Sequence, residues 1–98
     1  MAHLKSSLAD HVGTIAFDRE EKRNAFDAAF IDGMIDALAR FEADGARAVV
    51  LRSAAGGPVW SAGHDIEELP RAGVDPLPWS DPLERLLRAV KAFPAPVI

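Results

Sequence analysis

Residues 46–54, ARAVVLRSA, decide the fold class of this 98-residue chain. Residues 48–51 form a continuous apolar run, which is typical of a strand buried on both faces of a sheet. A helical pattern precedes this run, and a strand-like segment precedes that helix. Because a strand–helix–strand order favours parallel pairing, the sequence predicts an α/β fold.

The segments before this run supply the first strand and the first helix. Residues 11–17, HVGTIAF, alternate loosely and predict a strand that is the second arm of a hairpin turning near residues 10–11. Asp27 is placed to cap the helix, and Gly45 is placed to end it. Between them the large apolar residues recur at helical spacing: Phe30, Ile31, Met34, Ile35, Leu38 and Phe41.

The segments after the run predict a turn over residues 55–58, a short strand over 59–62 (VWSA) and a proline-rich surface loop over 70–82. Asp81 and Pro82 suit the start of a second helix, which Pro94 would end. Residues 95–98, APVI, read as the opening of another buried strand. A domain seldom stops inside a core strand, so we expect the chain to be a fragment.

Composition excludes several classes of partner. The net charge is −4, and no block of basic residues extends beyond Lys22-Arg23. This argues against a nucleic-acid or anionic-membrane surface, because both require concentrated positive charge. No segment approaches the length of a signal peptide core or of a membrane span. We therefore expect a soluble, cytoplasmic protein.

The chain contains no cysteine, which excludes a disulfide framework and a thiolate zinc site. Its three histidines, His3, His11 and His64, share no spacing typical of metal ligands. We therefore expect no metal site.

Residues 61–66, SAGHDI, suggest a chemical site. Ala62 and Gly63 have almost no side chain, so a ligand can approach the main chain closely. Successive amides that lead into a helix point outward unpaired, which suits a carbonyl oxygen gaining negative charge, and Asp65 can cap that helix. The donor would be the main-chain N–H of His64. The alternative is an ordinary small-Gly-x-Asp turn with no function.

Taken together, KRNAF (22–26), ARAVVLRSA (46–54), VWSAGHDI (59–66) and FPAPVI (93–98) resemble the N-terminal part of the crotonase (enoyl-CoA hydratase/isomerase) superfamily. The resemblance implies a crotonase-like ββα-spiral fold, of which residues 1–98 are an N-terminal portion truncated at the start of a core strand. Within the superfamily, SAGHDIEELP, DPL, SDPL and KAFPAPVI most resemble the methylmalonyl-CoA decarboxylases.

The resemblance also implies the site. The His64 amide would be one of two oxyanion-hole donors to an acyl-CoA thioester oxygen. The other residues implied to line the coenzyme A pocket are Lys22, Arg23, Asn24, Ala25, Ala62, Gly63, Asp65 and Ile66. Without the resemblance, the charged run over residues 18–23 would read as a solvated turn.

The implied activity is decarboxylation of methylmalonyl-CoA to propionyl-CoA through a thioester enolate. No cofactor would be needed, and the parent protein would be a homotrimer or hexamer. The alternatives are hydration or isomerisation of an enoyl-CoA, and a truncated, non-catalytic binding module. In this family the second oxyanion donor and the acid/base residues lie beyond Ile98, so we expect the 98 residues alone to be inactive and not stably folded.

Overall fold

The computed structural model describes residues 4–63 and 81–98. The elements in this part of the chain are β1 (Leu4–Ala9), β2 (Val12–Phe17), a short 3₁₀-helix η1 (Glu20–Lys22), α1 (Ala28–Ala43), β3 (Ala48–Ser53) and α2 (Pro82–Ala92). The predicted strands and helices around residues 11–17, 28–43, 48–51 and 82–92 are confirmed.

The sheet has the order β1-β2-β3, with β1 antiparallel and β3 parallel to β2. The predicted hairpin is present, because Ala9 pairs with Val12 across a two-residue turn. Both turn residues, Asp10 and His11, have positive φ angles, 52° and 64°. Positive φ at both positions matches the twist of the flanking strands. The helix α1 between β2 and β3 makes the crossover that parallel strands require.

Helix α1 begins and ends where the sequence predicts. The Asp27 carboxylate accepts a hydrogen bond from the Phe30 amide, and Gly45 follows the helix with φ +77°. Its apolar stripe lies on the sheet and forms the core together with residues from the strands and from α2. The most deeply buried large side chains are Ile15, Phe17, Phe30, Ile31, Met34 and Val49.

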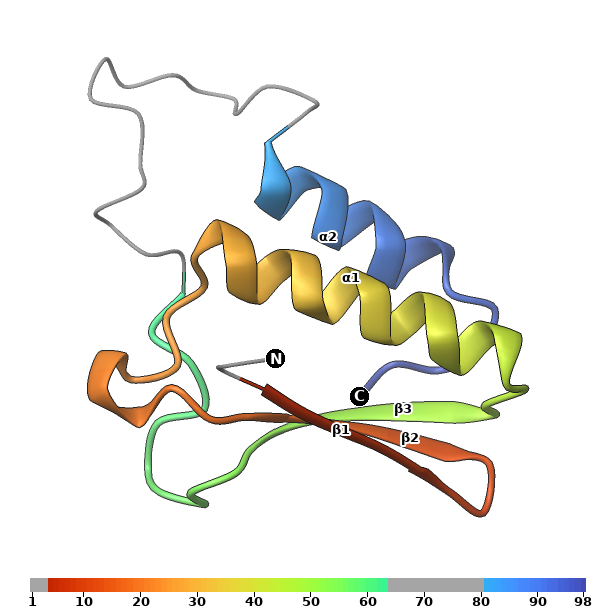
Figure 1. Cartoon of the computed structure of the whole chain (residues 1–98), viewed down its shortest axis with the longest axis horizontal. Coiled ribbons are helices and arrows are strands. Elements are labelled where there is room, and N and C mark those ends of the chain that lie inside the picture. The colour runs from red at the N-terminus through yellow and green to blue at the C-terminus, as the bar shows by residue number, and fades with distance from the viewer. Residues whose placement is uncertain (1–3, 64–80) are drawn as a thin grey trace.

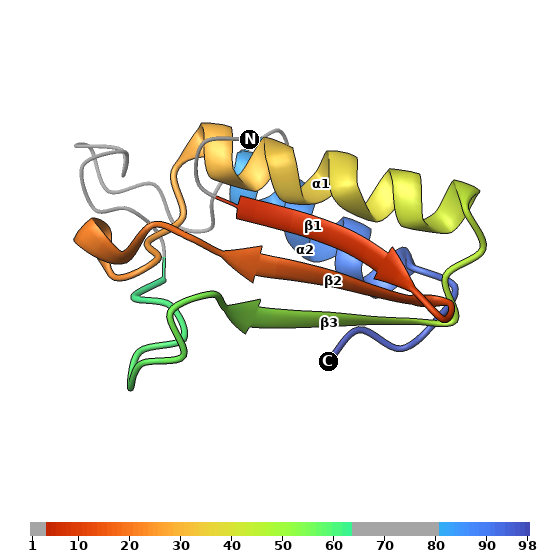
Figure 2. The same cartoon turned by 60° about the horizontal axis from the view of Figure 1, so that its bottom comes forward.

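Both helices lie on the same face of the sheet (Figure 1, Figure 2). The prediction that residues 48–51 are buried on both faces is therefore wrong for the described part of the chain. Val49 faces the helices and is fully buried, whereas Ala48, Val50 and Leu51 are partly exposed.

Helix α2 packs beside α1 and has the predicted start. The Asp81 carboxylate accepts from the Leu83 amide at 2.9 Å, and Pro82 occupies the first turn. Leu86 is buried against the core, but Leu87 is 55% exposed. An ion pair between Arg85 and Asp32, 3.2 Å apart, joins the two helices at the surface.

The segment after α2, predicted to open a strand, returns to the sheet beside β3. Val97 forms a parallel bridge with Val49. Three main-chain hydrogen bonds hold residues 96–98 to β3: Val49 N–H to Pro96 O, Ile98 N–H to Val49 O, and Leu51 N–H to Ile98 O. Residues 96–98 thus continue the sheet beyond β3.

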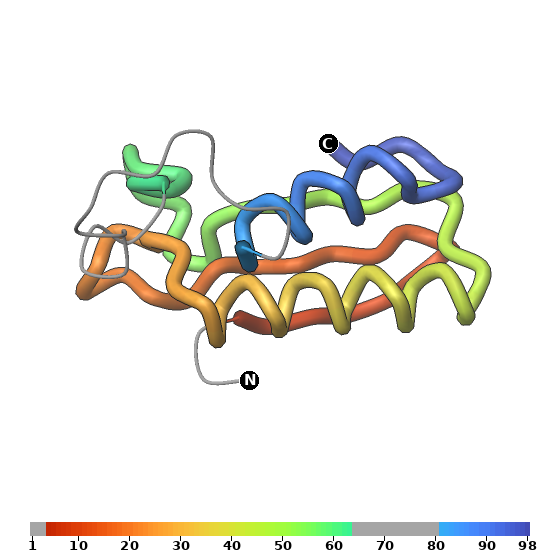
Figure 3. The backbone as a smooth tube through the Cα atoms, turned by 90° about the horizontal axis from the view of Figure 1, so that it is seen from above, coloured from red at the N-terminus to blue at the C-terminus, as the bar shows by residue number. Residues whose placement is uncertain are grey.

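The carboxyl ends of β2 and β3 lie at the same end of the sheet, and the loops that follow them are neighbours there (Figure 3). We call residues 18–27 the first loop and residues 54–63 the second loop. The predicted strand over residues 59–62 is wrong, because this segment is irregular and bonds to the first loop. No helix in the described part of the chain has the length and apolar character needed to cross a membrane.

Candidate functional site

The two loops are joined through their main chains. The Ala62 amide donates to the Arg23 carbonyl at 2.9 Å, and the Phe26 amide donates to the Gly63 carbonyl at 2.7 Å. This brings Arg23, Ala25, Ala62 and Gly63, which the sequence assigned to one site, next to each other. Loops at the carboxyl ends of parallel strands are where α/β proteins commonly bind ligands.

The first loop has an unusual backbone. After η1, the non-glycine residues Arg23 and Asn24 have φ angles of 53° and 57°. This left-handed conformation is uncommon for such residues and persists only where the surroundings hold it. Main-chain hydrogen bonds from Arg23 to Glu20, from Asn24 to Arg19 and from Ala25 to Lys22 hold it here. The conformation leaves the side chains of Lys22 and Arg23 exposed.

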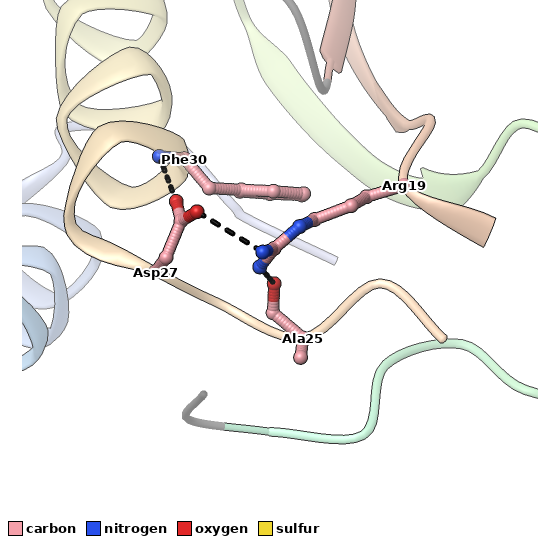
Figure 4. Close-up of polar contacts among 4 residues, drawn as sticks. All are labelled: Arg19, Ala25, Asp27 and Phe30. Carbon is pink, nitrogen blue, oxygen red and sulfur yellow. Dashed lines mark hydrogen bonds and ion pairs between the residues drawn. The ribbon is translucent and has the colours of Figure 1, made fainter. Parts of the chain in front are cut away.

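Arg19 is buried beneath this loop, with only 8% of its surface exposed (Figure 4). One guanidinium nitrogen donates to the Ala25 carbonyl at 2.8 Å, and another lies 3.2 Å from the Asp27 carboxylate. The solvated charged turn expected without the family resemblance is therefore wrong for Arg19. A local charge pattern cannot distinguish a solvated arginine from one whose partners are supplied by the fold.

Asn24 is also buried, at 4% exposure. Its side-chain nitrogen donates to Ser53 Oγ and to the Trp60 carbonyl, both at 3.0 Å. The Ser61 hydroxyl donates to the Asn24 carbonyl at 2.8 Å. Asn24 was expected to line a coenzyme A pocket. It lines the pocket between the two loops, and its polar atoms bond to the protein. Arg19, Ser53 and Ser61 were not among the predicted site residues, and partners this distant in sequence leave no local pattern.

The second loop leaves open space beside its main chain at Gly63. Gly63 has φ +89°, and none of the described residues places an atom within 4 Å of the position where a Cβ would stand. Close approach to the backbone, predicted from the sequence, is therefore possible at this residue. The prediction of successive unpaired amides is wrong for Ala62 and Gly63, because the Arg23 carbonyl and Ser61 Oγ accept their N–H groups.

Three predicted site residues, His64, Asp65 and Ile66, lie outside the described residues, as does Trp79. Trp60, in the second loop, is half exposed at 49%. Its indole N–H donates to the Leu51 carbonyl at 3.1 Å, and its ring meets that of Phe17 edge-on with centroids 4.9 Å apart. Trp60 therefore anchors the second loop to the core while one side stays accessible.

A pocket of about 240 Å³ lies between the two loops. It is lined by Glu20, Arg23, Asn24, Ser53, Ala55, Gly57, Pro58 and Val59. A larger open hollow of about 770 Å³ lies between β1 and α1, but it contains none of the predicted site residues. Within residues 4–63 and 81–98, no three histidine or acidic side chains gather as a metal site would require.

Comparison with known proteins shows which family the sequence matches. The sequence profile of the enoyl-CoA hydratase/isomerase family matches residues 8–98. Methylmalonyl-CoA decarboxylase of Escherichia coli K12 is 42% identical over 87 residues, which are 89% of this chain and 33% of that enzyme. The 4-chlorobenzoyl coenzyme A dehalogenase-2 of an Arthrobacter species is 37% identical over 68 residues, 69% of this chain and 24% of its own length.

Solved structures share the fold. Methylmalonyl-CoA decarboxylase in complex with 2-nitronate-propionyl-CoA superposes with a TM-score of 0.87 at 38% identity, covering 97% of this chain and 36% of that one. A complex of the same kind of enzyme with 2S-carboxypropyl-CoA gives the same values. The chain thus spans about a third of the length of the relatives it matches.

Proposed function

Because the chain belongs to the enoyl-CoA hydratase/isomerase (crotonase) family and has its fold, we propose that the protein containing it decarboxylates methylmalonyl-CoA. The observation that carries the proposal is the open backbone at Gly63, held to the first loop and placed at the carboxyl ends of two parallel strands. The similarity to methylmalonyl-CoA decarboxylases, among them complexes with acyl-CoA compounds, supports this choice of substrate.

In the proposed reaction the bond between the carboxylate carbon and the α-carbon breaks, and carbon dioxide leaves. The electron pair of that bond moves into the thioester, whose oxygen becomes an enolate oxygen. The main-chain N–H of His64, next after Gly63, donates to this oxygen together with a second donor from the rest of the fold. Protonation of the α-carbon then gives propionyl-CoA. A donor aimed at the developing charge stabilises the transition state more than the substrate.

The first loop would hold the coenzyme A part of the substrate. Lys22 and Arg23 are exposed beside the pocket between the loops, and their positive charges suit the phosphates of coenzyme A. The main chains of Ala25, Ala62 and Gly63 would line the same pocket, because the two loops are bonded to each other, and Asp65 and Ile66 follow in the sequence. This proposal gives the first loop the role of binding and the second loop the role of catalysis.

The reaction as proposed needs no metal or organic cofactor, because the thioester itself accepts the electron pair. We propose that the whole protein is a cytoplasmic homotrimer or hexamer. The alternative proposal, hydration of an enoyl-CoA, would require two carboxylates placed around a water molecule.

The test uses what we call the family-length protein: residues 1–98 continued either by the natural downstream sequence or by the matching part of the E. coli decarboxylase. It is incubated separately with methylmalonyl-CoA, crotonyl-CoA and 4-chlorobenzoyl-CoA. We expect propionyl-CoA and carbon dioxide from the first substrate only. Turnover of crotonyl-CoA or 4-chlorobenzoyl-CoA, without decarboxylation of methylmalonyl-CoA, would show that the proposed function is wrong. Residues 1–98 alone serve as the control and should be inactive.

A further inference from the structure

Asn24 connects three separate parts of the chain. Its main-chain N–H donates to the Arg19 carbonyl at 2.8 Å, and its side-chain Oδ1 accepts from the Arg19 amide at 2.9 Å. Its Nδ2 donates to Ser53 at the end of β3 and to the Trp60 carbonyl in the second loop. The donor and acceptor types of these partners also fix which side-chain atom is oxygen and which is nitrogen.

The connection continues to Gly63 through Ser61. The Ser61 hydroxyl donates to the Asn24 carbonyl at 2.8 Å, and the same oxygen accepts from the Gly63 amide at 3.0 Å. Every polar atom of Asn24 therefore has a protein partner. A continuous hydrogen-bond network connects Arg19 to Gly63 through Asn24 and Ser61. No polar atom of Asn24 remains without a partner to recognise a ligand.

The orientation of the Gly63 carbonyl decides where the next amide points. That carbonyl accepts from the Phe26 amide at 2.7 Å, two residues after Asn24. The carbonyl of one residue and the N–H of the next residue belong to one planar peptide group, so they cannot be turned independently. The hydrogen bonds of the Gly63 amide and of the Gly63 carbonyl thus hold this residue from both sides.

We propose that Asn24 is a positioning residue that acts through Ser61 and the Gly63 peptide to aim the oxyanion donor, and that it does not contact coenzyme A. This inference rests on the proposed function. It also explains why an asparagine stands at a left-handed position (φ 57°), which asparagine adopts more readily than most residues. Misplacing a catalytic group by about 1 Å can lower a rate by about 100-fold.

The test uses two matched pairs of variants in the family-length protein. Asn24→Asp keeps the acceptor for the Arg19 amide but loses both donors, whereas Glu21→Gln changes an exposed carboxylate in the same loop and is the control. Ser61→Ala removes the bridging hydroxyl, whereas Ser61→Thr retains one. With methylmalonyl-CoA, we expect kcat to fall by about 10- to 100-fold in Asn24→Asp and Ser61→Ala, with KM changed by less than about threefold. Ser61→Thr should recover most of kcat.

A second measurement does not depend on activity. Amide hydrogen exchange at Phe26, Ala62 and Gly63 should become at least about tenfold faster in Asn24→Asp and Ser61→Ala, with Ile15 and Val49 unchanged. A raised KM with normal kcat would show that Asn24 contacts the substrate and would overturn the proposal. Unchanged exchange at the three amides would also overturn it. If the unaltered protein decarboxylates nothing, the proposed function is wrong, and the exchange result alone decides whether Asn24 positions Gly63.

Discussion

The guanidinium of Arg19 lies 3.2 Å from one carboxylate oxygen of Asp27, whose other oxygen accepts the Phe30 amide at 2.8 Å. Asp27 therefore has two roles, because it caps α1 and neutralises the buried arginine under the first loop. The Asp27 side chain is 20% exposed and the Arg19 side chain is 10% exposed, so the two charges face each other largely away from solvent. The start of α1 and the shape of the first loop are consequently coupled.

This coupling predicts different losses for two substitutions at position 27. Asp27→Asn keeps an oxygen for the cap but loses the ion pair, and we expect a loss of about 3 kcal/mol in the free energy of unfolding. Asp27→Ala loses the cap as well and should cost about 1 kcal/mol more. Denaturant unfolding of the family-length protein measures both. Equal stability of the two variants and the unaltered protein would contradict the role of the pair.

Any side chain at position 13 of β2 would clash with the core. A Cβ at this position would stand 2.7 Å from Cδ2 of Phe41, so the ring would have to move. We expect Gly13→Ala to lower the unfolding free energy by about 1–3 kcal/mol. Gly57→Ala is the control, because its Cβ would meet open space, and it should change stability by less than about 0.5 kcal/mol. Combining Gly13→Ala with Phe41→Leu should cost less than the sum of the two, and simple additivity would refute the contact.

Substitutions in the turn between β1 and β2 should stabilise the protein. Asp10 and His11 both have positive φ, which side chains with a Cβ adopt at a cost. The double substitution Asp10→Asn with His11→Gly introduces the residue pair preferred in such turns and should raise stability by about 1 kcal/mol. Gly45→Ala, which places a Cβ at φ +77°, should lower stability. Thermal unfolding of the family-length protein measures both changes. A destabilised double variant would show that one of the native side chains contributes a contact outweighing the backbone strain.

The isolated 98-residue chain should not form a stable monomer. Its described helices cover one face of the sheet, and large apolar side chains are exposed, among them Leu8, Val12, Leu87 and Ile98. Small domains are only marginally stable, so such exposure favours association or loss of fixed packing. Size-exclusion chromatography with thermal unfolding tests this expectation. A monomer that unfolds in one sharp transition would contradict it.

The sequence predicted those parts of the fold that local patterns determine. The Asp27 cap, the stripe from Phe30 to Phe41 and the Asp81-Pro82 start are local signals, and the structure confirms the helices they indicate. Residues 95–98 were predicted to open another strand, and the structure pairs Val97 with Val49 in parallel.

What could not be predicted depends on contacts between distant residues. Residues 59–62 have apolar members typical of a strand, but two hydrogen bonds to the first loop determine their irregular path. The Asn24 side chain donates to the Trp60 carbonyl, and the Ala62 amide donates to the Arg23 carbonyl. The left-handed backbone at Arg23 and Asn24, and the burial of Arg19, arise in the same way. Predicting the site required the family resemblance, whereas the connection between the two loops required the structure.

The central claim is that the main chain at His64, and not its imidazole, stabilises the enolate. The direct measurement is kcat for methylmalonyl-CoA in His64→Ala and His64→Pro variants of the family-length protein, each first shown to be folded. His64→Ala retains the N–H and should keep kcat within about tenfold, whereas proline has no N–H to donate and also alters the turn. We therefore expect His64→Pro to lose about 100- to 1,000-fold or more. An equally large loss in both variants would contradict the account, because the imidazole would then be the group on which the reaction depends.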